Sequence, residues 1–381
     1  MASNLISEPC FRLCLDVQQE LDGRQDAPIN LESNENATIN FLASAQNNSN
    51  NVVAEAVGQL AQKARPQTVA EGVAPTTVNL LYSAPDCDEA DECTDGSICD
   101  VTGSWDSYRR WVQFTINECA QKSGVIPIEQ FRTVCENPGG ALADEIQRAS
   151  RSIKRSMNRI AIESLAASFG DYVNGTNSGT TPAVVPVVTV DQDGLMRPNR
   201  IAIAQFNTQY RRKQWRNGFQ IIGGDSIAEH NDIAVSMGMT QLPYTYDNRL
   251  DDVLQNVFTD TLSNAITIPY GVFNFVEWYD NDLYLSDPRL QTPTRSRTKL
   301  TIDGMTYDFD LYLDECNDVW KWRLRKKFDF FKIPAAAYCE GADDLILRWN
   351  TICGPADCGM LSASVPNGNG GDNGGEPNGE G

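Results

Sequence analysis

Residues 141–170, ALADEIQRASRSIKRSMNRIAIESLAASFG, constrain the fold of this chain more than any other stretch. Apolar side chains recur there at steps of three and four residues, the period of a helix with one buried face. They are Leu142, Ile146, Ala149, Ile153, Met157 and Ile160. Gly170 is a typical C-terminal stop. The sequence therefore predicts one long amphipathic helix of roughly 40 Å.

The opposite face of this helix carries an arginine stripe, formed by Arg148, Arg151, Arg155 and Arg159. The whole chain has a net charge of −20 and a pI near 4.4. A cationic stripe is usually solvated or ion-paired, and we expect this one to pair with acidic groups of the same chain or of a neighbouring copy. The acidic balance repels nucleic acid and anionic membranes. We therefore expect no sequence-specific nucleic-acid binding and no membrane association.

Helix-like and strand-like segments alternate through the rest of the chain. Helices are expected over residues 10–21, 105–124 and 197–218. Strand composition, rich in β-branched and aromatic residues, is found over residues 76–83, 180–194, 263–279, 298–315 and 325–334. Within residues 298–315, Asp303-Gly304 fits the turn of a hairpin between two paired strands. The predicted fold class is α+β.

The two ends of the chain differ from the middle. Residues 1–60 are dense in asparagine, which favours turns, so we interpret them as an arm rather than part of a core. Residues 364–381, SVPNGNGGDNGGEPNGEG, offer no apolar surface and are expected to be disordered. The N-terminus lacks the pattern of a signal peptide, and we expect a protein that stays where it is made. No apolar run approaches the ~20 residues that span a bilayer.

Residues 216–230, RNGFQIIGGDSIAEH, join an apolar triplet to a Gly-Gly pair and to His230, the single histidine of the chain. The stretch lacks the Gly-Lys-Ser/Thr of a phosphate-binding loop and the third glycine of a dinucleotide fingerprint. We interpret it as a strand that ends in a Gly-Gly turn with positive φ, with Asp225 capping the next helix. No elbow motif stands near His230, so a packed or surface histidine is expected rather than a general base.

Residues 84–104, APDCDEADECTDGSICDVTGS, form the most acidic segment. Read from Asp91, the segment has some of the features of a calcium-binding loop, but Cys93 and Thr102 stand where two ligands belong. Its three cysteines are six residues apart, whereas zinc sites use short cysteine pairs. We interpret the segment as an exposed acidic loop and leave calcium binding open.

The eleven cysteines are an odd number, and without an export signal reduced thiols are favoured over disulfides. No paired carboxylates and no nucleophile with its base stand out. We therefore predict no catalytic residues, no cofactor and no metal site, and expect that the protein is not an enzyme.

The order of these features resembles the Hong Kong 97-type fold of tailed-phage major capsid proteins. In that family a long spine helix crosses the peripheral domain, and residues 141–170 are similar to it. The axial domain often has a helix, a glycine turn and a short apolar strand, and QYRRKQWRNGFQIIGGD is similar to that arrangement. Some members cross-link their extended loop through lysine, but residues 66–121 of this chain contain no lysine.

The resemblance covers roughly residues 60–345 and implies a division of the chain into segments. They are an N-terminal arm (1–65), an extended loop (66–104), a peripheral domain with the spine helix (105–180), an axial domain (181–264), peripheral return strands (265–345), and a C-terminal segment with the Gly/Asn-rich tail (346–381).

The function that the resemblance implies is a virion shell protein, with copies in hexamers and pentamers around the phage genome. Its partners would be other copies and virion proteins such as portal, scaffold or decoration proteins. It would be located in the virion after assembly in the host cytoplasm. The alternatives are another virion component (a neck, tail or head-decoration protein) and an exported calcium-binding adhesin.

Overall fold

The computed structural model describes residues 9–24, 36–45, 76–83, 109–127, 138–170, 183–184, 188–190, 196–198, 201–212, 218–236, 244–258, 264–281, 294–332 and 345–350. The acidic segment 84–104 and the tail 364–381 lie outside these residues. In the described part the fold is α+β: helices pack on two largely antiparallel sheets.

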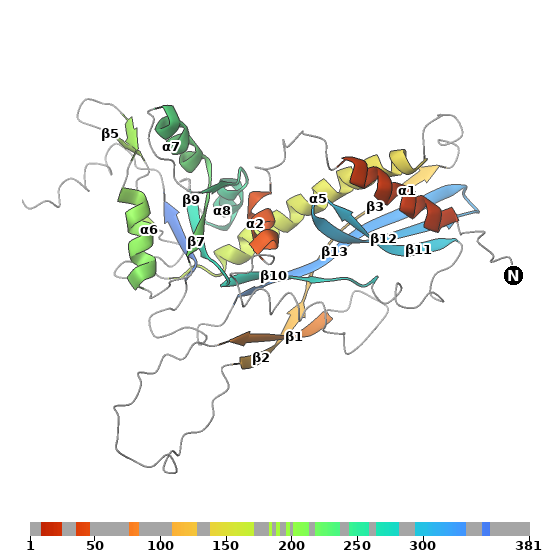
Figure 1. Cartoon of the computed structure of the whole chain (residues 1–381), viewed down its shortest axis with the longest axis horizontal. Coiled ribbons are helices and arrows are strands. Elements are labelled where there is room, and N and C mark those ends of the chain that lie inside the picture. Colours follow the sequence, from red (N-terminus) through yellow and green to blue (C-terminus); the bar gives the residue numbers. More distant parts are fainter. Residues whose placement is uncertain are drawn as a thin grey trace, which may run out of the picture.

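The long helix is α5, Pro138–Ala166. It confirms the helix predicted over residues 141–170 and begins three residues earlier. The predicted apolar stripe is buried except for Ile160, which packs against the core partly exposed. Gly170, just past the helix, donates its N–H to the carbonyl of Ile346 over 2.8 Å. Figure 1 shows α5 running along the length of the elongated molecule.

The main sheet has five strands: β10 (Phe273–Trp278), β13 (Val319–Lys332), β12 (Met305–Asp314), β11 (Arg295–Ile302) and β3 (Glu118–Pro127). The 14-residue β13 is its axis. It pairs with β3 along one edge, and with β12 and then β10 along the other. The predicted hairpin is confirmed, because Asp303 and Gly304 link β11 to β12 with φ of 47° and 75°.

A separate two-stranded sheet pairs β1 (Thr76–Ser83) with β2 (Arg109–Ile116). The strand predicted over residues 76–83 is confirmed. The helix predicted over residues 105–124 is wrong, because this stretch forms β2 and β3. β-branched and aromatic residues dominate β2, RRWVQFTI, and each gains a cross-strand partner on β1, which outweighs weak helical periodicity.

The remaining five-stranded sheet, called the second sheet below, has the order β4 (Ala183–Val184), β14 (Leu347–Asn350), β9 (Asn264–Pro269), β7 (Phe219–Gly223) and β8 (Thr245–Tyr246). Helices α6 (Ile201–Arg212), α7 (Asp225–Ser236) and α8 (Leu250–Val257) precede or follow its strands, and β5 (Val188–Val190) pairs with β6 (Met196–Pro198). Both β9 and β14 belong to this sheet with β7. Strand β14 therefore joins this sheet from the C-terminal part of the chain.

Two N-terminal helices belong to the folded body. Helix α1 (Pro9–Arg24) buries Cys14, Val17 and Leu21, and α2 (Ala37–Ala45) buries Ile39 and Leu42 in the same core that α5 lines. The helix predicted over residues 10–21 is confirmed. The interpretation of residues 1–60 as an arm rather than part of a core is wrong for these two helices, because a high asparagine content says nothing of the apolar faces that α1 and α2 bury.

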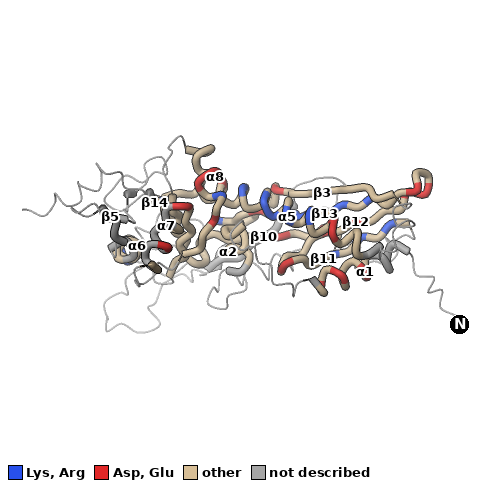
Figure 2. The backbone as a smooth tube through the Cα atoms, turned by 90° about the horizontal axis from the view of Figure 1, so that it is seen from above, with Lys and Arg blue, Asp and Glu red and all other residues tan. Residues whose placement is uncertain are grey.

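Figure 2 shows Lys and Arg positions on α5 and β13 in the middle of the molecule, and Asp and Glu positions at α8 and at the turn after β12. Within the described residues, no helix is long and apolar enough to cross a membrane.

Candidate functional site: a charged network on the main sheet

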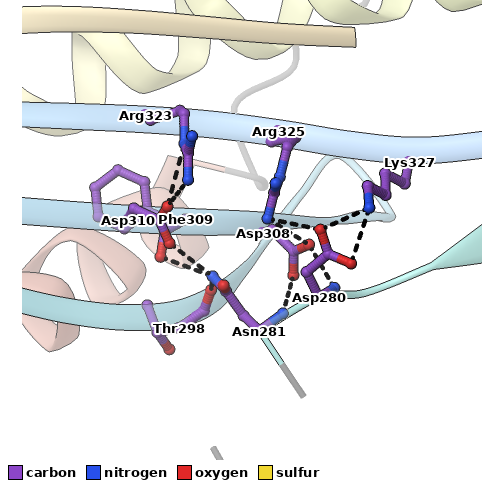
Figure 3. A network of polar contacts seen from close by, with 9 residues as sticks. All are labelled: Asp280, Asn281, Thr298, Asp308, Phe309, Asp310, Arg323, Arg325 and Lys327. Atoms are coloured by element: carbon purple, nitrogen blue, oxygen red, sulfur yellow. Dashed lines mark hydrogen bonds and ion pairs between the residues drawn. The ribbon is translucent and has the colours of Figure 1, made fainter. Parts of the chain in front are cut away.

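The main sheet carries its densest charged network on the face opposite the apolar core (Figure 3). Alternation along β12 places Tyr307 and Phe309 in the core and turns Asp308 and Asp310 to the other face. The register sets Asp308 opposite Arg325 and Asp310 opposite Arg323 on β13. Opposite charges thus face each other across neighbouring strands, which stabilises the pairing.

Asp280, in the turn after β10, neutralises two cations of β13. Its carboxylate lies 3.0 Å from Arg325 Nη2 and 3.0 Å from Lys327 Nζ. The side chains of Arg325 and Lys327 are only 15% and 8% exposed. Because a buried cation without a partner is costly, Asp280 is a structural requirement of this end of the sheet.

Asp308 is the most buried carboxylate of the network. It accepts the backbone N–H groups of Asp280 over 2.8 Å and of Asn281 over 3.2 Å. Burial raises the pKa of Asp308 to about 6, and the two N–H donors and Arg325 oppose this shift. The carboxylate thus fixes the turn after β10 to β12.

Asn281 joins the two ends of the network. Its side-chain amide donates to the carbonyls of Thr298 and Phe309 and to Asp310, over 2.8, 3.1 and 3.2 Å. Asp310 also accepts from Arg323 on β13. The amide therefore connects β11 and β12 through the turn after β10.

On the core face of the same strands, Lys326 is fully buried. Its ammonium lies 3.0 Å from Glu277 and donates to the Thr306 carbonyl over 2.7 Å and to Tyr279 Oη over 2.9 Å. It also lies 4.4 Å from the centre of the Tyr279 ring, a cation–π contact. Burial lowers the pKa of Lys326, while Glu277 favours its charged form.

A third buried polar cluster ties α2 to α5 and to the loop before α8. Asp247 accepts the backbone N–H and the hydroxyl of Thr38 over 2.9 and 2.7 Å, and the side-chain amide of Asn158 over 3.0 Å. Asn158 in turn accepts the N–H of Ile39 over 2.9 Å. Because every bond joins segments far apart in the sequence, the cluster fixes how the second sheet sits against the long helix.

The stretch IIGGD is a structural turn, as interpreted, but not for the expected reason. Neither Gly223 nor Gly224 is among the residues with positive φ. A Cβ on Gly224 would lie 2.1 Å from Asp251 Oδ2, and one on Gly223 would lie 2.7 Å from Ile227 Cβ. The glycines are required by close approach, so the expectation of positive φ is wrong.

Asp225 does not cap α7 as expected, because it is the first residue of that helix. Its backbone N–H donates to Asp251 over 3.1 Å, so the capping carboxylate comes from α8. Sequence proximity could not reveal this partner, which is 26 residues away. His230 lies within α7, and its side chain is outside the described residues.

The arginine stripe of α5 is exposed, as predicted. Arg148 and Arg159 lie 3.6 Å from Glu145 and 2.8 Å from Glu163 on the same helix. Arg151 and Arg155 are also exposed on this face. Partners on the same chain are therefore found for Arg148 and Arg159, whereas contacts with a neighbouring copy stay a prediction.

These clusters share a chemical character. Their carboxylates accept from cations, hydroxyls, amides and backbone N–H groups, and the amides of Asn158 and Asn281 donate to carboxylates and carbonyls. This arrangement holds strands and turns in place. Among the described residues, no three His, Cys, Asp or Glu side chains are grouped as a metal site requires. Cys119 and Cys316 are free thiols. The possible calcium loop at residues 84–104 lies outside the described residues.

No protein-family model and no curated protein matches the chain. Solved structures that it resembles come from bacteriophages. A chain of the cyanophage A-1(L) capsid asymmetric unit is 10% identical, with a TM-score of 0.44, over 86% of this chain and 99% of the other.

A chain from Mycobacterium phage Adephagia is 12% identical, with a TM-score of 0.38, over 78% and 92%. A chain of the capsid of Ralstonia phage GP4 is 9% identical, with a TM-score of 0.37, over 74% and 85%.

Proposed function

We propose that this chain is a major capsid protein of a tailed phage, a structural subunit that assembles into an icosahedral shell around the genome. The observation that carries the proposal is the mechanical design of the fold. A 29-residue helix lies along a sheet whose central strand has 14 residues, and charged networks on the sheet fix its strands. The subunit is therefore elongated, and its long helix and cross-strand ion pairs stiffen it along its length. A subunit of a thin protein shell needs both properties.

The hairpin β1–β2 supports the same function. Its contact with the main sheet is at its base, where Phe114 packs edge-on against Phe331 with ring centres 5.4 Å apart. The chain of β2 passes directly into β3, with Asn117 between them. A hairpin attached by its base suits an extended loop that reaches over a neighbour, and we assign β1, residues 84–108 and β2 to that role.

The two five-stranded sheets also suggest how the rest of the chain divides into domains. We assign α5 and the main sheet to a peripheral domain, and the second sheet with α6, α7 and α8 to an axial domain. The polar clusters are then structural, the chain acts without catalysis, and its partners are further copies in hexamers and pentamers. In a virion, such a shell would also contact portal, scaffold or decoration proteins. Assembly would take place in the host cytoplasm.

Electron microscopy of the purified full chain tests the proposal. Closed shells of uniform diameter are expected when the protein is concentrated or expressed alone. Rings or tubes would point instead to a neck or tail component. A stable monomer at every concentration, in the presence and absence of the other virion proteins, would contradict a shell role.

A further inference from the structure

One long edge of the main sheet has no partner strand. Strand β3 pairs with β13 through all ten of its residues, antiparallel and along one edge only. Within the part of the chain that the structure describes, no strand pairs with its other edge. Ala120 and Ile126 turn into the core that α5 lines, so the helix packs on a face of β3. An open edge of this length offers backbone N–H and C=O groups to another strand.

The opposite edge of the sheet differs from this one. There Gln18 of α1 bonds the backbone of Thr301 on β11 in both directions, over 3.1 and 3.3 Å. On β3, by contrast, Gln121, Lys122 and Ser123 in the middle of the strand are all exposed. Because folded proteins rarely leave a long strand edge open, a partner strand is expected at β3.

The charges of β3 indicate which partner fits. The strand has two charged side chains, Glu118 and Lys122. Glu118 is partly buried and Lys122 is exposed, and neither forms an ion pair within the described residues. Two opposite charges four residues apart make the strand complementary to itself. In an antiparallel pair of such strands, Glu118 of each copy lies opposite Lys122 of the other, which is a stabilising cross-strand arrangement.

We infer that the open edge of β3 pairs with β3 of a second copy, antiparallel and across a two-fold axis centred on Ala120. The inference rests on the proposed shell function, because an icosahedral shell has two-fold axes at which copies meet through the same surface. Only this register sets both charge pairs opposite each other. A shift of the centre by two residues would set Lys122 opposite Lys122, or Glu118 opposite Glu118.

The same register brings a native thiol next to an exposed position. Positions 119 and 121 of the two strands lie opposite each other, because they flank position 120 equally. Cys119 is a free thiol and Gln121 is exposed. Directly opposite residues of antiparallel strands have Cα atoms about 4.5–5.5 Å apart, which is within the range that a disulfide needs. Gln121→Cys therefore places a new thiol within reach of Cys119 of the second copy.

Disulfide trapping in the full chain tests the inference. After assembly and mild oxidation, the Gln121→Cys chain is expected to run mainly as a covalent dimer on a non-reducing gel. Mass spectrometry should find a peptide that joins position 121 to Cys119, and the further change Cys119→Ser should abolish this dimer. The matched control is Ser123→Cys, on the same side of the same strand. Its expected neighbour is Asn117, so it should give no such dimer.

Charge changes at the same edge test the register. Glu118→Lys in the Gln121→Cys chain should lower the yield of the covalent dimer about fivefold, because it sets like charges opposite each other. Glu118→Lys together with Lys122→Glu should restore most of the yield. Thermal denaturation shows whether each variant is folded.

The possible results separate this contact from the shell function. The covalent dimer in a protein that never closes into shells would support the inference and contradict the shell function. Shells in which the thiol introduced at position 121 stays free, or joins a residue other than Cys119, would overturn the inference and leave the shell function standing. A swapped chain that dimerises no better than Glu118→Lys alone would also overturn it.

Discussion

At the scale of single residues, the buried polar side chains of this protein mainly connect segments that are far apart in the sequence. Asp247, Asp251 and Asp308 each accept backbone N–H groups from a segment remote in sequence. A carboxylate can do this because it offers several acceptor sites. The consequence is that single substitutions at these positions should act on stability and on its pH dependence.

Asp308 gives the first prediction. Its pKa of about 6 in the folded chain lies above the ~3.9 of an unfolded aspartate, so the folded state binds this proton more tightly. The stability that the proton brings is complete below about pH 4 and is lost as the pH rises through about 6. From this group, the free energy of unfolding should fall by about 3 kcal/mol across that range.

Urea denaturation between about pH 4 and pH 7 at constant ionic strength measures this slope. Asp308→Asn should flatten it, whereas Asp252→Asn, an exposed position of α8, should leave it unchanged. Identical slopes in wild type and Asp308→Asn would show that another group is responsible.

Gly224 gives the second prediction. Because an added Cβ would lie 2.1 Å from the Asp251 carboxylate, Gly224→Ala should destabilise the chain by about 1–3 kcal/mol through overpacking. Shortening the partner in Gly224→Ala/Asp251→Ser should recover part of the loss relative to the sum of the two single changes. Gly304→Ala, where a Cβ meets open space but φ is +75°, should cost roughly 1–2 kcal/mol. If the double variant were no better than additive, the clash would not be the cause.

At the scale of elements, the sequence predicts what depends on periodicity and misses what depends on partners. The apolar period of residues 141–170 locates α5 because the helix buries one continuous face. The Asp-Gly pair locates the β11–β12 turn because few residues adopt positive φ. These signals depend only on residues close together in the sequence, so they can be recognised without knowing the rest of the fold.

Residues 109–127 show why the rest could not be predicted. They form β2 and β3 only because β1 and β13 lie beside them. The charged network is missed for the same reason. Nothing in the sequence distinguishes Asp280, Asp308 and Arg325 from charged residues on the surface. Only the register of β12 against β13 and the turn after β10 bring them together.

The arginine stripe of α5 carries the prediction at this scale. Reversing one exposed charge should change the free energy of unfolding by only ~0–1 kcal/mol, because exposed ion pairs are weak. Reversing Arg148, Arg151 and Arg155 together should lower particle yield far more than it lowers the melting temperature, since this face of α5 is solvent-exposed in the single chain. Particle yield by sedimentation and melting temperature by calorimetry separate the two effects. Normal assembly of the folded triple variant would show that the stripe faces no acidic neighbour.

At the scale of the whole molecule, the structure is an elongated body in which segments from both ends of the chain close the two sheets. Helix α1 lies against α5 and β11, and β14 completes the second sheet between β4 and β9. Gln18 of α1 pairs with the backbone of Thr301 on β11 in both directions, over 3.1 and 3.3 Å. This amide occupies an edge of the main sheet that would otherwise be open to another strand.

The last prediction compares the two ends directly. Removing residues 1–24 deletes α1 with its buried Cys14, Val17 and Leu21 and exposes the edge of β11, so the melting temperature should fall by several degrees or more, as expected for the loss of a few kcal/mol. Removing residues 364–381 deletes glycine, asparagine, proline, serine and acidic residues, with one valine as the only aliphatic side chain besides proline, so the melting temperature should stay within about one degree of wild type. Gln18→Ala in the full chain separates the two contributions of α1, because it opens the strand edge and keeps the apolar contacts. If Gln18→Ala aggregates at an unchanged melting temperature, α1 protects the edge as well as the core. If removal of residues 1–24 leaves both melting temperature and solubility unchanged, the N-terminal segment is an arm after all, and the contacts of α1 contribute nothing to the stability of the fold.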